Sequence, residues 1–195
     1  MHHRTIGAMI LALVAAKGIS AEDSSATLSE LVDGADRIAV GDVGTMRRVI
    51  EDQVVHTKDG EEITGKFIFT YVNVTPTEHI VGGQVSTVTV RLLGGLHPDG
   101  TKVTTYLQAP SLSSEEKVLL FLKEAPERGP NQEVVHQIAH HHAGKFRVEG
   151  EGATARLVRP LPNSSLKIDP SQGIDESPIL LSRMKQLIQA ERTGQ

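Results

Sequence analysis

The spacing of hydrophobic positions along the chain predicts a protein built mainly of β-strands. In Val85–Leu93, valine and leucine alternate with threonine and arginine, which is typical of a strand with one face in water. Glycine- or proline-containing turns separate the other stretches that are rich in β-branched or aromatic residues. These expected strands are Arg37–Val43, Arg48–His56, Lys66–Thr75, Lys102–Leu107, Val134–Ile138, Lys145–Val148 and Ala155–Val158.

One further segment, Val118–Leu122, is apolar at every position. Only a strand that is covered on both faces can use such a run, because successive side chains of a strand point in opposite directions. We therefore expect this segment at the centre of the core.

Two helices are expected, one near each end of the strand-rich region. Thr27 and Glu30 have the spacing of a capping box, which predicts a short helix up to about Gly34. The second helix is expected over residues 176–192, with Ser177 as N-cap and Pro178 at the first helical position. Its apolar stripe comprises Leu180, Met184, Leu187 and Ile188. Such a stripe packs against the sheet or, alternatively, docks onto another protein.

The first 21 residues have the layout of a secretory signal peptide. A short cationic start, Met1–Arg4, precedes the uncharged run Ile6–Ala16, and small residues follow up to Ala21. We expect cleavage near Ala21, with Ser20 and Ala16 as alternatives, and a mature protein that is secreted or periplasmic. An N-terminal anchor helix that is never cut is the other interpretation. The apolar run is about half of the roughly 20 residues that a membrane-spanning helix needs, so no membrane association is expected after the leader is removed.

The organisation that follows is a signal peptide (1–21), a β-domain (22–159), a Pro/Ser/Asn-rich linker (160–175) and a C-terminal helix (176–192) packed on the domain. Many short strands, glycine-rich turns and few helices favour a small OB-like β-barrel or sandwich with a short N-terminal helix and a C-terminal amphipathic helix.

Charge and composition exclude several kinds of partner and chemistry. The net charge of −4 becomes about −6 once Arg4 and Lys17 leave with the signal peptide, and the remaining basic residues are scattered, so nucleic acid is not an expected partner. The chain has no cysteine, which rules out disulfides and a thiolate nucleophile. Neither a Gly-x-Ser-x-Gly elbow nor a His-Glu-x-x-His pair occurs. We therefore predict no catalytic residues, no required cofactor and a protein that is not an enzyme.

A set of short motifs resembles a family of exported bacterial proteins of unknown function. The motifs are Thr27-Leu28-x-Glu30-Leu31-Val32-x-x-Ala35-Asp36-x-Ile38-x-Val40-Gly41-x-Val43, Thr70-Tyr71-Val72-x-Val74, Gly94-Gly95, Ala109-Pro110 and Val118–Leu122. Their order is also distantly similar to the OB-fold barrels of tissue-inhibitor-of-metalloprotease and netrin-like modules. That similarity implies a barrel. Those inhibitors use an N-terminal cysteine and disulfides, and this chain has neither.

One cluster of potential metal ligands stands out, in the segment from His136 to His142. If this segment is a strand, His136, His140 and His142 share one face. His140 and His142 would then lie about 7 Å apart and could hold one zinc or nickel ion weakly, whereas His136 would lie about 13 Å from His140 and would need a bulge to join them. The alternative is an exposed hairpin tip whose histidines only titrate.

These observations together predict an exported, non-enzymatic module that binds an unknown protein or small ligand through its loops or a sheet face. A metal-binding protein centred on the three histidines is the first alternative. A protease inhibitor of the barrel type, which follows from the fold resemblance alone, is the second.

Overall fold

The structure is a computed structural model that describes residues 26–56, 62–96, 102–103, 110–158, 166–167 and 179–194. The expected signal peptide and nearly all of the expected linker lie outside these residues. So do Ser177 with Pro178, and Asp59–Gly60, a dipeptide that is typical of a hairpin turn. Of the strand expected at Lys102–Leu107, only the first two residues are described, and they are extended.

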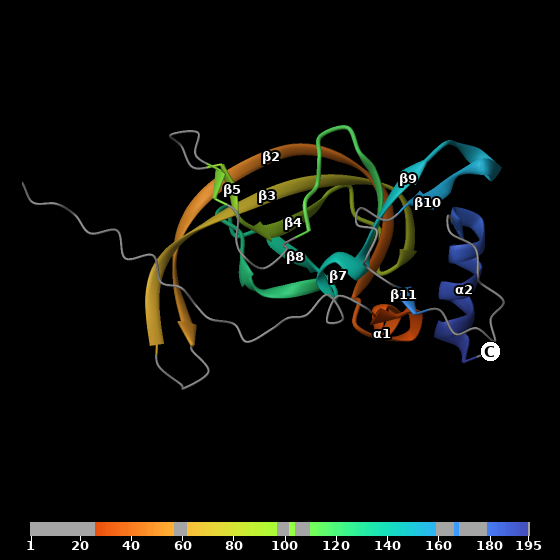
Figure 1. Cartoon of the computed structure of the whole chain (residues 1–195), viewed down its shortest axis with the longest axis horizontal. Coiled ribbons are helices and arrows are strands. Elements are labelled where there is room, and N and C mark those ends of the chain that lie inside the picture. The colour runs from red at the N-terminus through yellow and green to blue at the C-terminus, as the bar shows by residue number, and fades with distance from the viewer. Residues whose placement is uncertain are drawn as a thin grey trace, which may run out of the picture.

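The described residues form a mainly β fold around an eight-stranded mixed sheet (Figure 1). Its strands run in the order β12-β10-β9-β7-β2-β3-β4-β8, and β8 also pairs with β7. The β8 strand is therefore parallel to β4 on one side and antiparallel to β7 on the other. The strand bounds are β2 Arg37–His56, β3 Glu62–Val81, β4 Val88–Leu93, β7 Lys117–Arg128, β8 Val134–Ile138, β9 Lys145–Glu149, β10 Arg156–Val158 and β12 Ile179–Leu180. Two small additions are the pair β1 (Ala26–Thr27) with β11 (Leu166–Lys167) and the pair β5 (Gly95–Leu96) with β6 (Lys102–Val103).

The two strands expected at Arg37–Val43 and Arg48–His56 are one continuous strand, β2. Its pairing register with β3 shifts between Val43 and Met46, which marks a β-bulge. A bulge keeps a strand extended while it bends, and β2 and β3 arch together as long curved ribbons (Figure 1). Gly44, which lies within this register shift, therefore marks a bend in one strand, and the expected break was wrong.

The prediction that Val118–Leu122 lies at the centre of the core is confirmed. All five side chains are at most 1% exposed. Val118, Leu120 and Leu122 pack with residues of β3 and β4 such as Val72 and Val90. Leu119 and Phe121 point to the opposite face, where they pack with both helices. The strand β7 therefore separates two apolar layers.

Both expected helices are present, although the second begins later than expected. The first, α1 (Leu28–Asp33), has the full capping box: the Glu30 N–H donates to Thr27 Oγ1 (3.1 Å) and the Thr27 N–H donates to Glu30 Oε2 (2.7 Å). The second, α2 (Leu181–Thr193), starts after Leu180 because Ile179 and Leu180 pair with β10. No helix in the described ranges is long and apolar enough to cross a membrane.

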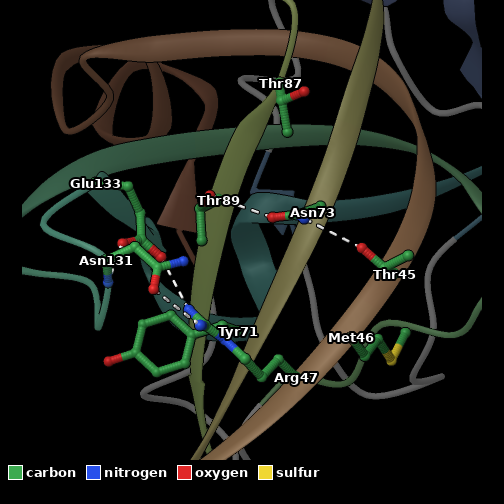
Figure 2. A pocket seen from close by; sticks show the side chains of 9 residues that line it. All are labelled: Thr45, Met46, Arg47, Tyr71, Asn73, Thr87, Thr89, Asn131 and Glu133. Atoms are coloured by element: carbon green, nitrogen blue, oxygen red, sulfur yellow. Dashed lines mark hydrogen bonds and ion pairs between the residues drawn. The ribbon is translucent and has the colours of Figure 1, made fainter.

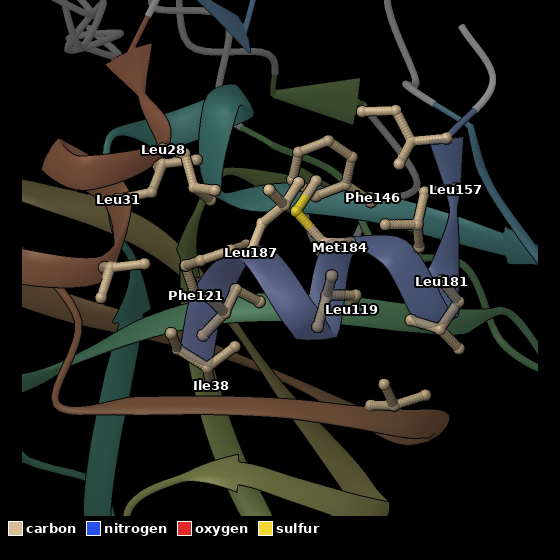
Figure 3. Close-up of a cluster of buried hydrophobic side chains, with 14 of the residues drawn as sticks. Leu28, Leu31, Ile38, Leu119, Phe121, Phe146, Leu157, Leu181, Met184 and Leu187 are labelled. Carbon is tan, nitrogen blue, oxygen red and sulfur yellow. The ribbon is translucent and has the colours of Figure 1, made fainter. Parts of the chain in front are cut away.

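The apolar stripe of α2 packs on the core, as expected. Leu181, Met184, Leu187 and Ile188 are buried, and Met184 and Leu187 point toward Phe121 and Phe146 (Figure 3). Leu180, which we expected in this stripe, lies at the N-cap instead.

Pro126 and Pro130 favour a loop between them, but the observed turn lies further along the chain. The strand β7 continues through Pro126 to Arg128, and the chain reverses at Gly129–Glu133. The pairing with β8 is irregular between Glu124 and Arg128. This irregularity accommodates the proline, which cannot donate a ladder hydrogen bond.

Candidate binding site

A pocket of about 460 Å³ lies where the loop between β7 and β8 covers part of β2, β3 and β4. It opens on the outer face of these strands, the face turned away from the core layer that contains Val72 and Val90. Its lining residues are Thr45, Met46, Arg47, Tyr71, Asn73, Thr87, Thr89, Asn131 and Glu133 (Figure 2).

Three polar side chains form a row across the floor of this pocket, one from each strand. Asn73 Nδ2 donates to Thr45 Oγ1 (3.1 Å), and Thr89 Oγ1 donates to Asn73 Oδ1 (3.3 Å). Asn73 and Thr89 lie opposite each other in the β3–β4 ladder, and Thr45 lies in the bulge of β2. The row holds the Asn73 amide in one orientation, and its hydroxyl and amide groups have further hydrogen-bonding capacity for a ligand.

The β7–β8 loop is fixed above this row by the carboxylate of Glu133. Glu133 Oε2 accepts from the Asn131 N–H (2.7 Å), and Glu133 Oε1 pairs with Arg47 Nη2 (3.1 Å). A Cβ at Gly129 would lie 2.4 Å from the Glu133 carboxyl carbon, so a larger residue there would displace this carboxylate. The Glu133 carboxylate therefore holds the loop through one bond to the loop backbone and one ion pair to β2.

Tyr71 forms the aromatic wall beneath the loop. The Arg47 guanidinium lies 5.8 Å from the centre of its ring, and its hydroxyl donates to Glu51. Burial, followed by the hydrogen bond to Glu51, raises the pKa of Tyr71 to about 12. Tyr71 therefore stays protonated and neutral at physiological pH.

A buried arginine completes the support behind Tyr71. Arg91 Nη2 pairs with Glu51 Oε2 (2.8 Å), and the Arg91 guanidinium lies 3.6 Å from the centre of the Phe69 ring. Its Nη1 lies 3.7 Å from Glu127. The cationic groups on this face thus have carboxylate partners within the chain, and the row on the pocket floor is uncharged. Such a surface favours a neutral polar ligand.

Two ionisable side chains of the pocket are held in one state by their surroundings. Tyr71, whose pKa is raised, is a poor nucleophile because it holds its proton. The Glu133 carboxylate already accepts from Arg47 and from the loop backbone.

The strand expected at Val134–Ile138 is present, but the extended segment that would place His136, His140 and His142 on one face does not continue beyond it. The strand β8 ends at Ile138, His140 has a left-handed backbone (φ 49°), and a 3-10 helix, η2, covers His141–Gly144. A turn forms here because Ala139 and Ala143 pack into the core beside the helices. Residues 136, 140 and 142 therefore do not follow the alternation of one strand.

The structure places the three predicted ligands in different surroundings. His136 is buried on β8, opposite Glu124 of β7 and Val90 of β4. His140 is exposed, and its ring lies against Gly34 after α1. His142 is buried in η2. Over the described ranges, no group of three or more His, Cys, Asp or Glu side chains could hold a metal ion. Zinc or nickel binding by His136, His140 and His142 stays a prediction, which titration with the metal can test.

His136 is a buried base without a full set of hydrogen bonds. Burial, followed by the positive charge of Arg37, lowers the pKa of His136, and Glu124 opposes this shift. Its Nδ1 has no hydrogen-bond partner among the described residues. These surroundings favour the neutral imidazole.

Sequence reasoning missed the pocket, although one signal was visible. The polar side of Val85–Leu93 contains Thr87 and Thr89, which we assigned only to a wet face. The row forms only because β4 lies beside β3 and β3 beside β2.

Comparison of the chain with models of protein families, with curated proteins and with solved structures finds no match.

Proposed function

We propose that this protein is an exported, non-enzymatic binding module that holds a neutral, hydroxyl-rich ligand, an oligosaccharide, on the outer face of β2, β3 and β4. The observation that carries the proposal is the row of Thr45, Asn73 and Thr89 beneath a loop that is already fixed in place. A site arranged before binding loses less conformational entropy when the ligand arrives.

The strand pairing supports a closed, OB-type barrel. The five strands β2, β3, β4, β8 and β7 pair in a ring, because β8 contacts both β4 and β7. In chain order, the fifth of these strands lies between the third and the fourth, as in a Greek-key barrel.

This fold proposal also bears on the ligand. OB-folds bind oligonucleotides and oligosaccharides on the face of their second and third strands, between the loops that join strands one to two and four to five. Here the pocket lies on β3 and β4, the second and third strands of the ring, and the β7–β8 loop joins its fourth and fifth strands. The acidic net charge disfavours a polyanion. By this fold-level analogy, an oligosaccharide is the better ligand.

The test is an array of neutral oligosaccharides probed with the wild-type protein and with Asn73→Leu. This change removes the amide that links the row and keeps the branched shape and the number of heavy atoms of the side chain. Gln137→Leu, on the exposed side of β8 and outside the pocket, is the matched control. We expect the wild type and the control to bind the same saccharides, and Asn73→Leu to bind at least about tenfold more weakly, since one or two hydrogen bonds are lost. Equal binding by Asn73→Leu, or binding to no saccharide, would contradict the proposal.

A further inference from the structure

The strand β2 has a long edge without a partner strand in the described part of the chain. Its pairing with β7 ends at Asp42, and one more pair of hydrogen bonds joins Val43 to Glu115 and Glu116. From Met46 onward, β2 pairs with β3 alone. In Figure 1 the two strands extend together beyond the rest of the sheet.

The hydrogen bonds of β3 show which backbone groups of β2 point to this open edge. The Ile68 carbonyl accepts from the Gly94 N–H (2.7 Å), on the side of β4. Ile50 lies opposite Ile68. Antiparallel pairs alternate between those that bond to each other and those that point outward, so the N–H and C=O of Ile50 point away from β3. Arg48 and Asp52 lie two residues before and after Ile50, so their N–H and C=O groups also point away from β3.

The side chains at these three positions share one face of the ribbon and have a self-complementary order. Arg48 and Asp52 are exposed, and Ile50 between them is 43% exposed, so all three side chains are accessible to a partner strand. In its own chain, Asp52 pairs only with Lys66 (3.0 Å) among the described residues, and both side chains are more than two-thirds exposed. A surface pair of this kind contributes little, so it does not prevent another partner.

We propose that this edge pairs with the same edge of a second copy of the chain, antiparallel about a two-fold axis at Ile50. In this register Ile50 lies opposite Ile50 of the second copy, and each Arg48 lies opposite an Asp52. Residues directly opposite in an antiparallel pair share a face, so the register forms two cross-strand ion pairs around one apolar contact. The interface is isologous, as a two-fold dimer requires.

The order of the charged residues along this edge favours a second copy of the chain as its partner, in preference to an unrelated strand. Charged side chains on an edge usually oppose association, because like charges meet. Here the charges of Arg48 and Asp52 meet opposite charges only when the partner strand is antiparallel and has the same order of residues: positive, apolar, negative. Arg47 and Glu51, on the other face, are already paired with Glu133 and Arg91 and are not needed for the contact.

Single-cysteine cross-linking tests this register, since the chain has no cysteine of its own. Ile50→Cys should form an intermolecular disulfide under mild oxidation, because the Cα atoms of a hydrogen-bonded antiparallel pair are about 5.5 Å apart. Arg48→Cys is the matched control, since its two copies would be about 13 Å apart, four residues along the ladder. Equal cross-linking of both variants, or of neither, would overturn the proposal.

Sedimentation velocity over a range of concentrations tests the same contact without oxidation. We expect the wild type to dimerise, and Arg48→Asp and Asp52→Arg each to weaken dimerisation by about tenfold, since each places two like-charged pairs across the edge. The Arg48→Asp, Asp52→Arg double variant restores opposite charges and should restore the dimer. Lys123→Glu, an exposed charge change on β7, should leave it unchanged. A wild type that stays monomeric throughout, or a double variant as weak as the single ones, would contradict the proposal.

Discussion

Tyr71 should make the folding stability of this protein fall steeply at high pH. Tyr71→Phe removes the hydroxyl on which this effect depends. Burial and the hydrogen bond to Glu51 raise the pKa of Tyr71 to about 12, from an ordinary value of 10.0. The folded state therefore keeps the proton over a pH range in which the unfolded state loses it.

The magnitude follows from the linkage between protonation and folding. Between pH 10 and pH 12, the folded protein binds one proton more than the unfolded chain, so stability falls as pH rises. Each pKa unit corresponds to about 1.4 kcal/mol, which gives a loss of about 1.4 kcal/mol by pH 11 and about 2.3 kcal/mol by pH 12, where the folded-state tyrosine is itself half ionised. Below pH 10 the contribution is fully present.

The assay is urea unfolding of the wild type and of Tyr71→Phe at pH 8, 10 and 11. Other groups also titrate in this range, so the quantity to compare is the difference in unfolding free energy between the two proteins. We expect this difference to shrink by about 1.4 kcal/mol between pH 8 and pH 11. A difference that stays constant would show that Tyr71 titrates normally and that its contact with Glu51 is not formed.

Four further predictions concern the core, the histidines and the N-terminus. Phe121→Ala should cost about 3 to 5 kcal/mol in urea unfolding, because the side chain is 0% exposed and packs 6.1 Å from the ring of Phe146; an unchanged midpoint would place β7 outside the core. Burial lowers the pKa of His136, so stability should fall as pH drops below about 6.5, and less so in His136→Gln; equal pH dependence of the two proteins would refute this. Calorimetric titration with zinc should give coincident isotherms for the wild type and the His140→Ala, His142→Ala double variant, because the segment turns after Ile138; zinc binding lost only in the variant would revive the metal site. If the leader is cleaved as proposed, the N-terminus of the mature protein should lie near Glu22, and recovery of Met1 by sequencing would argue against cleavage.

The features that the sequence predicted correctly depend on neighbours a few residues apart. The capping box of α1 needs only Thr27 and Glu30, and the burial of Val118–Leu122 follows from apolar residues at both parities of a strand. The stripe of α2 was recognised for the same reason. Local patterns of this kind are complete within one segment, so they require no knowledge of the partner strands.

The errors arose where tertiary pairing decided the local conformation. The bulge between Val43 and Met46 depends on the register with β3, and the start of α2 depends on pairing between Leu180 and β10. The turn after Ile138 depends on core packing of Ala139 and Ala143. None of these partners could be inferred from spacing within a single segment.

The candidate site could not be predicted from the sequence for the same reason. Its central row joins Thr45 to Asn73, 28 positions apart, and its ion pair joins Arg47 to Glu133, 86 positions apart. Threonine, asparagine and arginine are ordinary surface residues, so only their arrangement across three strands and a loop distinguishes them.

The most direct test of the proposed binding face is amide chemical-shift mapping of the isotope-labelled protein during titration with a saccharide that it binds. The proposal predicts that the largest shift changes fall on Thr45, Asn73, Thr89 and the Gly129–Glu133 loop, and that Asn73→Leu reduces them. Changes that concentrate on α2 or on the β9–β10 pair, with these residues unaffected, would contradict it.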